Sequence, residues 1–170
     1  VGRGASFLLN LPPDRRGLIH ENEVKSLRGM RDILDRTFNV NLAAGAGVKT
    51  SLQISEFGPQ NMLDADNRTF WTPGPEYTSC IIDFDLREMK MFDCLLLQEN
   101  FRNGQRFEEF VLETLIDGKW RETAKGSTIG YKRLLRFEAV NARNARLRIL
   151  SSRGSPEIAT FGLFRMANKK

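Results

Sequence analysis

The spacing of hydrophobic residues changes from helical to alternating after about residue 45. Before that point, Val24, Leu27 and Leu34 recur at the spacing of one helix face, which predicts a helix that begins near Glu21. After it, apolar and polar residues alternate in short runs separated by turn residues, the pattern of half-buried strands. Asp117-Gly118 lies between two such runs and predicts a tight hairpin turn. The larger part of the chain is therefore predicted to be mainly β.

The alternating runs predict about eight short strands. No second helical pattern interrupts them, so the expected architecture is an antiparallel jelly-roll sandwich. The predicted strands are Val48–Ile54, Cys80–Asp85, Phe92–Leu97, Phe107–Ile116, the short run from Lys119, Tyr131–Phe137, Ala145–Leu150 and Ile158–Phe164.

A different strand pattern stands near the beginning of the chain. Phe7 to Leu11 is apolar without alternation, as in a parallel strand that is covered on both faces, and Pro12 and Pro13 end it. A strand followed by a helix is half of a βα repeat, and no later part of the chain continues that repeat. We therefore expect residues 1–45 to be a piece of a larger α/β domain with a small-residue linker, and residues 46–170 to be the sandwich.

The composition is that of a soluble globular protein, with 41% hydrophobic and 28% charged residues among 170. No apolar run approaches the roughly 18 residues of a membrane span, so no membrane-spanning segment is expected. The net charge of +5 is compatible with nucleic-acid binding. However, Arg146 and Arg148 alternate with apolar residues, the pattern of the solvent-exposed face of a strand. Since no nucleic-acid-binding motif accompanies the charge, no nucleic-acid partner is expected.

Residue types that perform catalysis are sparse. The single histidine, His20, precedes the predicted helix and is expected to be a partly exposed cap residue. Cys80 and Cys94 lie in apolar strands, where each acts as a small hydrophobic residue. The sequence does not decide whether they form a disulfide between neighbouring strands. Acidic pairs such as Asp83 and Asp85 alternate with inward apolar residues, a structural pattern. We expect no catalysis by this chain alone.

Several motifs of the sandwich resemble those of the discoidin-like family, also called F5/8 type C, whose members are galactose-binding-like jelly rolls. Their order and spacing carry the resemblance together. The motifs are Leu63–Trp71, Gly104–Phe107, Phe110–Glu113, Asp117–Trp120, Ser127–Arg133 and Ala145–Arg148.

The segment Leu8–Asn22 resembles the last barrel strand and helix of bacterial α-L-fucosidases of glycoside hydrolase family 29. Some members of that family carry a discoidin-like domain directly after the barrel. The discoidin-like domain of those members has the same short sequence motifs as this chain at Gln98-Glu99, Gly104–Arg106 and Thr128–Arg133. Both halves of the chain therefore resemble one kind of parent protein.

This resemblance implies that residues 1–45 are the final strand and helix of a (β/α)8 barrel and that residues 46–170 are a non-catalytic accessory sandwich packed against it. The parent would hydrolyse terminal α-L-fucosyl linkages with retention, using an Asp nucleophile and a carboxylic acid/base that lie upstream of this chain. It would be secreted or periplasmic, with its signal peptide outside this sequence.

The loop Gln98–Asn103 combines residue types that bind sugars. Phe101 offers a platform for the apolar face of a sugar ring. Hydrogen-bonding partners for hydroxyl groups surround it: Glu99, Asn100, Arg102 and Asn103. The resemblance implies that the equivalent loop of galactose-binding relatives supplies an Arg and an Asn, so the expected ligand is a fucosylated or galactose-containing glycan.

The alternative for this loop is structural. Gln98, Glu99 and Arg106 would then brace the loop against the catalytic barrel, and the sandwich would bind no sugar. In that case the domain serves only to buttress its own barrel.

Calcium is a separate candidate ligand. Asp64, Asp66 and Thr69 supply oxygen atoms from one tight loop, as calcium prefers. The resemblance implies a further Glu near the C-terminal strand, where this chain has Thr160, so a structural calcium is not favoured. Otherwise Asp64 and Asp66 hydrogen-bond their own turn. No other cofactor is expected.

Overall fold

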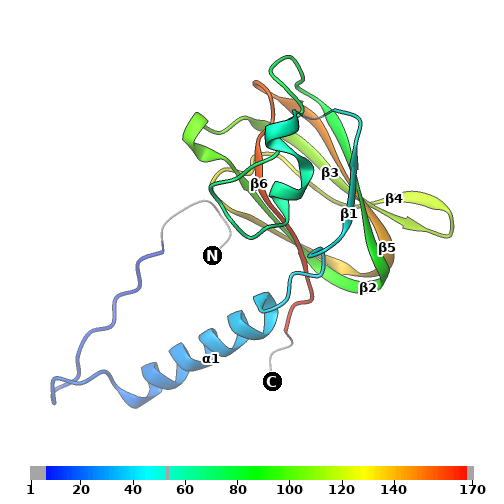
Figure 1. Ribbon diagram of the computed structural model, residues 1–170. Coiled ribbons are helices and arrows are strands. Elements are labelled where there is room, and N and C mark those ends of the chain that lie inside the picture. The colour runs from blue at the N-terminus through cyan, green and yellow to red at the C-terminus, as the bar shows by residue number, and fades with distance from the viewer. Residues whose placement is uncertain (1–6, 53, 168–170) are drawn as a thin grey trace.

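A computed structural model describes residues 7–52 and 54–167 of the chain (Figure 1). A helix leads into six strands, and three short 3-10 helices lie in the connections. The elements in chain order are α1 (Glu21–Phe38), β1 (Gly47–Thr50), η1 (Ser55–Phe57), η2 (Pro59–Met62), β2 (Cys80–Glu99), η3 (Phe101–Asn103), β3 (Phe107–Ile116), β4 (Lys119–Gly126), β5 (Arg133–Ser152) and β6 (Ile158–Phe164).

All strand pairs are antiparallel, in the order β1-β2-β5-β3-β4, with β6 paired to β2. The first half of β2 pairs with β1, and its second half pairs with β6. β5 follows β2 along both halves, while β3 joins only the second half of β5. The two long strands therefore pass from one layer of the sandwich to the other, which is how corners form in folded-over sheets. The predicted mainly β, antiparallel fold is confirmed.

Six strands replace the predicted eight because two pairs of runs are continuous. Cys80–Asp85 and Phe92–Leu97 belong to β2, and the runs around Tyr131–Phe137 and Ala145–Leu150 are largely parts of β5, each strand being 20 residues long. Their pairing shifts register between Asp85 and Lys90, a bulge that bends a strand without ending it. The polar residues at the bulge look like a turn in sequence, which explains the difference.

The predicted hairpin turn between β3 and β4 is confirmed. Asp117 and Gly118 have φ angles of 51° and 71°, the left-handed pair that a tight two-residue hairpin requires. Asn and Gly adopt such angles readily, and Asp tolerates them because its short side chain bonds locally.

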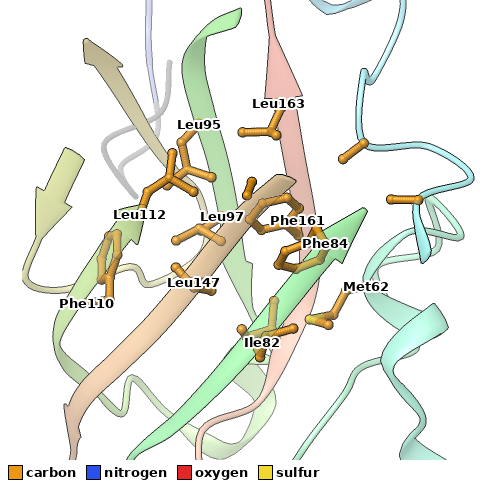
Figure 2. Close-up of a cluster of buried hydrophobic side chains, with 14 of the residues drawn as sticks. Met62, Ile82, Phe84, Leu95, Leu97, Phe110, Leu112, Leu147, Phe161 and Leu163 are labelled. Atoms are coloured by element: carbon orange, nitrogen blue, oxygen red, sulfur yellow. The ribbon is translucent and has the colours of Figure 1, made fainter. Parts of the chain in front are cut away.

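The hydrophobic core lies between the two layers (Figure 2). At its centre the rings of Phe84 and Phe161 stack with centroids 3.8 Å apart. Trp71 is fully buried, as expected for a residue that closes one end of the core, but Trp120 is not in the core and lies on the outer face beneath Arg146. Both tryptophans follow turn-rich sequence, which predicts that they close the ends of the core, and this prediction is wrong for Trp120. The register explains this, because Trp120 pairs with Leu115 on the face opposite the buried Thr114.

The strand predicted over Phe7–Leu11 is not formed. The described residues from 7 to 11 adopt no regular structure, and the side chains of Phe7 and Leu8 are 65% and 95% exposed. A strand needs a neighbour to satisfy its backbone N–H and C=O groups, and no strand of the sandwich lies beside this segment. The apolar run alone therefore does not make a strand among the described residues.

The prediction that a helix begins near Glu21 is confirmed. α1 begins after His20, whose Nδ1 accepts a hydrogen bond from the backbone N–H of Asn22 at 3.2 Å. His20 is therefore the partly exposed cap that the sequence predicted. Thr37 is the buried residue of α1, and Figure 1 shows the helix extending away from the sandwich. No helix of the described residues has both the length and the apolar character needed to cross a membrane.

The connection after α1 is pinned to the sandwich. Asn41 donates from Nδ2 to the carbonyl of Phe161 and accepts at Oδ1 from the N–H of Leu163, both at 3.1 Å. Phe38 packs edge-on against Phe164, with ring centroids 5.1 Å apart. The C-terminal end of α1 is thus held at β6 by polar and aromatic contacts together.

Candidate functional site

The predicted sugar-binding loop lies at one end of the sandwich, where β2 ends at Glu99. We call this region the loop end; it comprises Glu99–Phe107, Gly130-Tyr131 and Ser155–Glu157. Backbone hydrogen bonds join its segments, since the N–H of Glu99 donates to Gly130 and the N–H of Asn100 donates to Glu157. Residues that are far apart in the sequence therefore meet here.

Glu99 is the centre of the loop end and does not face solvent. Its side chain is 3% exposed. One carboxylate oxygen accepts hydrogen bonds from the N–H groups of Arg106 and Phe107, at 2.8 and 3.1 Å, and the other accepts from the N–H of Gly130. A carboxylate that accepts three backbone bonds ties three segments together and has little capacity left for a ligand.

Glu157 performs a similar task next to Glu99. Its carboxylate accepts from Asn100 Nδ2 at 2.7 Å, from Asn103 Nδ2 at 2.9 Å and from Arg106 Nη1 at 2.8 Å. Asn100 and Glu157 are both buried, so these bonds form away from water. The side-chain nitrogens of Asn100 and Asn103, both predicted to bind sugar hydroxyls, therefore donate to Glu157, although Asn103 itself is exposed. The sequence contains no signal for Glu157, because it joins the loop end from a distant turn.

Of the five predicted residues, Phe101 and Arg102 are exposed and take no part in the bonds around Glu99 and Glu157. Phe101 is 53% exposed, and Arg102 is also exposed. Tyr131, which the sequence analysis did not single out for binding, packs edge-on against Phe101 with ring centroids 5.2 Å apart. Gln98 Nε2 donates to the carbonyl of Tyr131 at 3.1 Å. The structural alternative thus fits Glu99 and Gln98, although they brace the loops of the sandwich itself.

The candidate calcium residues lie together but bond to one another. Asp64 accepts from Thr69 Oγ1 at 2.7 Å and from the N–H of Asp66 at 2.8 Å. Asp66 forms an ion pair with Arg68 at 2.8 Å, and this guanidinium lowers the pKa of Asp66 to about 2. A cationic side chain beside the carboxylate does not fit a calcium shell. The arrangement is that of a turn held by its own Asp side chains, the other interpretation of these residues.

Both cysteines are free thiols on the same strand, β2. Burial raises the pKa of Cys80 to about 12 and that of Cys94 to about 11. Because the thiolate is the reactive form, neither side chain is suited to nucleophilic chemistry at neutral pH.

Comparison with known proteins identifies the family to which the chain belongs. The model of the F5/8 type C domain matches residues 47–161. α-L-Fucosidase 1 of Arabidopsis thaliana is 35% identical over 171 residues, which cover 96% of this chain and 34% of that protein. A crystal structure of a glycoside hydrolase family 29 fucosidase of Ruminococcus gnavus in complex with fucose superposes with a TM-score of 0.91 at 30% identity, covering 98% of this chain and 35% of that one.

A more distant structure shares the fold alone. A chitosan-binding module of a chitosanase/glucanase from Paenibacillus sp. IK-5 superposes with a TM-score of 0.65 at 15% identity, covering 73% of this chain and 97% of the module. The same fold therefore occurs both in fucosidases and in a chitosan-binding module derived from another enzyme.

The chain belongs to the F5/8 type C domain family. Within it, the chain is homologous to a region of the α-L-fucosidases of glycoside hydrolase family 29, and it spans about a third of the length of the relatives it matches. These relatives include a plant protein and a bacterial one, so the likeness is broader than the bacterial enzymes that the motifs resemble.

We predict that Glu99→Gln lowers the free energy of unfolding by about 2 kcal/mol, because the substitution removes the charge that three backbone N–H groups share and replaces an acceptor by a donor. Urea unfolding measures the change. Glu109→Gln is the matched control, since Glu109 is exposed on β3 and its replacement should stay within about 0.5 kcal/mol. Equal effects of the two substitutions would contradict the role given to Glu99.

The Asp66–Arg68 pair predicts a second measurement, a carboxyl titration by NMR. The pKa of Asp66 is lowered from 3.8 to about 2, so its contribution to stability is complete above about pH 4 and is lost as the pH falls towards 2. Arg68→Ala should return the pKa of Asp66 towards 3.8, whereas Arg121→Ala should leave it unchanged. An Asp66 that titrates near 3.8 in the unsubstituted protein would show that the ion pair does not persist in solution.

Proposed function

We propose that this chain is a C-terminal, non-catalytic portion of an α-L-fucosidase, in which residues 1–45 complete the catalytic barrel and residues 46–170 form an accessory sandwich that packs against it. One observation carries the proposal. Nearly the whole chain aligns with a fucosidase but spans only a third of its length, and helix α1 leaves its apolar face uncovered. The missing two thirds of such a parent supplies the surface that would cover this face.

The uncovered face of α1 is well defined. Val24, Leu27 and Leu34 follow one another at helical spacing and are all only partly buried. Ion pairs within α1, between Arg31 and Asp35 and between Arg36 and Asp32, stabilise its solvent-exposed side. Most of the stability of a helix in a protein comes from packing of its apolar face, so the apolar stripe of α1 is expected to be buried in the complete protein.

In this proposal the parent hydrolyses terminal α-L-fucosyl linkages with retention. Retention requires two carboxyl groups about 5 to 5.5 Å apart that face one sugar. The buried carboxylates of this chain, Glu99 and Glu157, are both engaged by hydrogen bonds within the loop end. The reactive carboxyls would therefore belong to the barrel. For the parent we propose a secreted or periplasmic location, in keeping with the same family relationship.

A second candidate function is binding of a fucosylated or galactose-containing glycan at the loop end. The observation that favours it is the exposed pair of aromatic rings, Phe101 and Tyr131, with Arg102 beside them. An exposed ring provides the flat apolar surface on which a sugar stacks, and a guanidinium provides several hydrogen-bond donors. Glu99 and Glu157 would fix this platform indirectly by holding the loops that carry it.

Docking of α1 predicts a difference between the parent and this chain by itself. Leu27→Glu should lower the thermal midpoint of the parent, because it places a charge in the contact, while changing the stability of the 170-residue chain by no more than about 0.5 kcal/mol. Lys25→Glu, on the opposite side of α1, is the control and should affect neither. A parent whose midpoint is unchanged by Leu27→Glu would refute the docking.

Glycan binding at the loop end predicts shifts in an NMR titration with fucose, galactose and lactose. The shifts should concentrate at Phe101, Arg102 and Tyr131, and Phe101→Ala should weaken binding by about fivefold or more, because it removes the stacking surface. Tyr77→Ala removes another exposed aromatic ring and should have no effect. The absence of shifts at tens of millimolar sugar would leave the barrel contact as the function of the domain.

A further inference from the structure

A hollow on the outer face of the sandwich is separate from both surfaces described above. We call it the sheet-face hollow; it has a volume of about 510 Å³ and lies over β1, β2, β5 and β4. The strand register places Lys49 beside Asp83, and Asp83 beside Arg146, across this outer face. The side chains that matter to the argument below are Lys49, Asp83, Asp85, Arg87, Trp120 and Asn144.

An aromatic ring forms part of the wall of the hollow. Trp120 is only half-buried, and the Arg146 guanidinium lies 4.0 Å from its ring centroid. Arg146 is itself held by Asp83, with bonds of 2.6 and 3.1 Å. The indole therefore has a fixed orientation, because a cation–π contact and an ion pair support it from one side.

The charges of the hollow do not cancel. The carboxylates are neutralised by arginines, Asp83 by Arg146 and Asp85 by Arg143 at 2.8 Å. In the described part of the chain, neither Lys49 nor Arg87 has a carboxylate oxygen within 4.0 Å. Two exposed cations, Lys49 and Arg87, thus line the hollow together with the tryptophan without an ion pair of their own among the described residues.

Arg87 lies in the bulge of β2, between Asp85 and Lys90. Arg87 has a φ of 73°, which costs energy for a residue that carries a Cβ atom. Its N–H donates to Asp85 Oδ1 at 2.9 Å, and its guanidinium extends over Gly47. A side chain at position 47 would come within 3.2 Å of Arg87 Nη2, so the glycine leaves the room that the guanidinium occupies.

We propose that the sheet-face hollow binds a sugar ring that carries an anionic group, a sulfate ester or a carboxylate. The ring would lie against Trp120, with Lys49 and Arg87 binding the anion. Asp83 and Asn144 are placed to bond to hydroxyl groups, a combination that suits a saccharide because its hydroxyls both donate and accept. Two neighbouring cations beside a single aromatic ring match one isolated anion on a polar ring, whereas a nucleic acid presents a long row of phosphates.

The test is an NMR titration of the 170-residue chain with fucose monosulfate and with glucuronic acid. Fucose, inorganic sulfate and a thymidine oligonucleotide are the comparison ligands. We expect the Trp120 indole and the Gly47 amide to shift with at least one of the two anionic sugars. The sulfated and carboxylated probes distinguish which anion the hollow prefers. Binding should weaken as salt is added, because exposed charges are screened.

Variants separate the role of the cations from general folding effects. Arg87→Gly removes the guanidinium and also relieves the unfavourable backbone angle, so the fold should be retained. Combined with Lys49→Ala, it should weaken binding of the anionic sugar by about tenfold or more. Arg153→Ala removes one exposed positive charge elsewhere, from the pair with Glu108, and should leave binding unchanged.

Four results would overturn the proposal. They are no shift with either anionic sugar at tens of millimolar, equal binding of neutral fucose, inorganic sulfate that binds as tightly as the sugar, and an oligonucleotide that binds more tightly than either. Because the sheet-face hollow shares no residue with the loop end or with α1, these results leave the accessory function proposed above untouched. A failure of that function would in turn leave this test unchanged.

Discussion

The pairing of β2 with β5 is the interaction on which the rest of the molecule depends. Each of these strands is 20 residues long, and they remain paired through both layers of the sandwich. β1 and β3 attach to the outer edges of this pair in one layer, and β6 attaches to β2 in the other. The stacked rings of Phe84 and Phe161 close the space between the layers. A bulge, which bends strands without breaking their pairing, is what makes this architecture compatible with so few strands.

The residues of the loop end are of two kinds, buried and exposed. Glu99 and Glu157 are enclosed and must be satisfied by the protein, because an unpaired buried carboxylate is costly. They take up the N–H and amide groups of neighbouring loops, and this use fixes the loop conformations. Phe101 and Arg102 stay at the surface and are free to contact another molecule. The same short segment therefore combines an internal brace with an external platform.

The molecule presents three surfaces with different physical character. The apolar stripe of α1 is suited to a large apolar partner, and it lies next to the segment that resembles the end of a catalytic barrel. The loop end presents two aromatic rings. The sheet-face hollow presents a tryptophan with two exposed cations, Lys49 and Arg87, on a chain whose net charge is +5. Because these surfaces involve different elements, a parent enzyme could use them independently.

The sequence by itself determined the local features of this protein. Helical spacing identified α1, Asp117-Gly118 identified the hairpin, and alternation identified a mainly β sandwich, because each depends on neighbouring residues. The order of short motifs identified the family. Tertiary structure alone decided which polar groups are buried. Glu157 accepts a hydrogen bond from Asn100, which is 57 positions away, and no local sequence pattern predicts this contact.

Tertiary structure also decided how far each strand runs and which way some side chains face. Trp120 lies on the outer surface because of strand register, and the bulge near Arg87 joins two predicted strands into one. The apolar run at Phe7–Leu11 shows the converse. Its pattern is that of a buried strand, yet it forms none among the described residues, because a strand exists only when another strand takes up its hydrogen bonds.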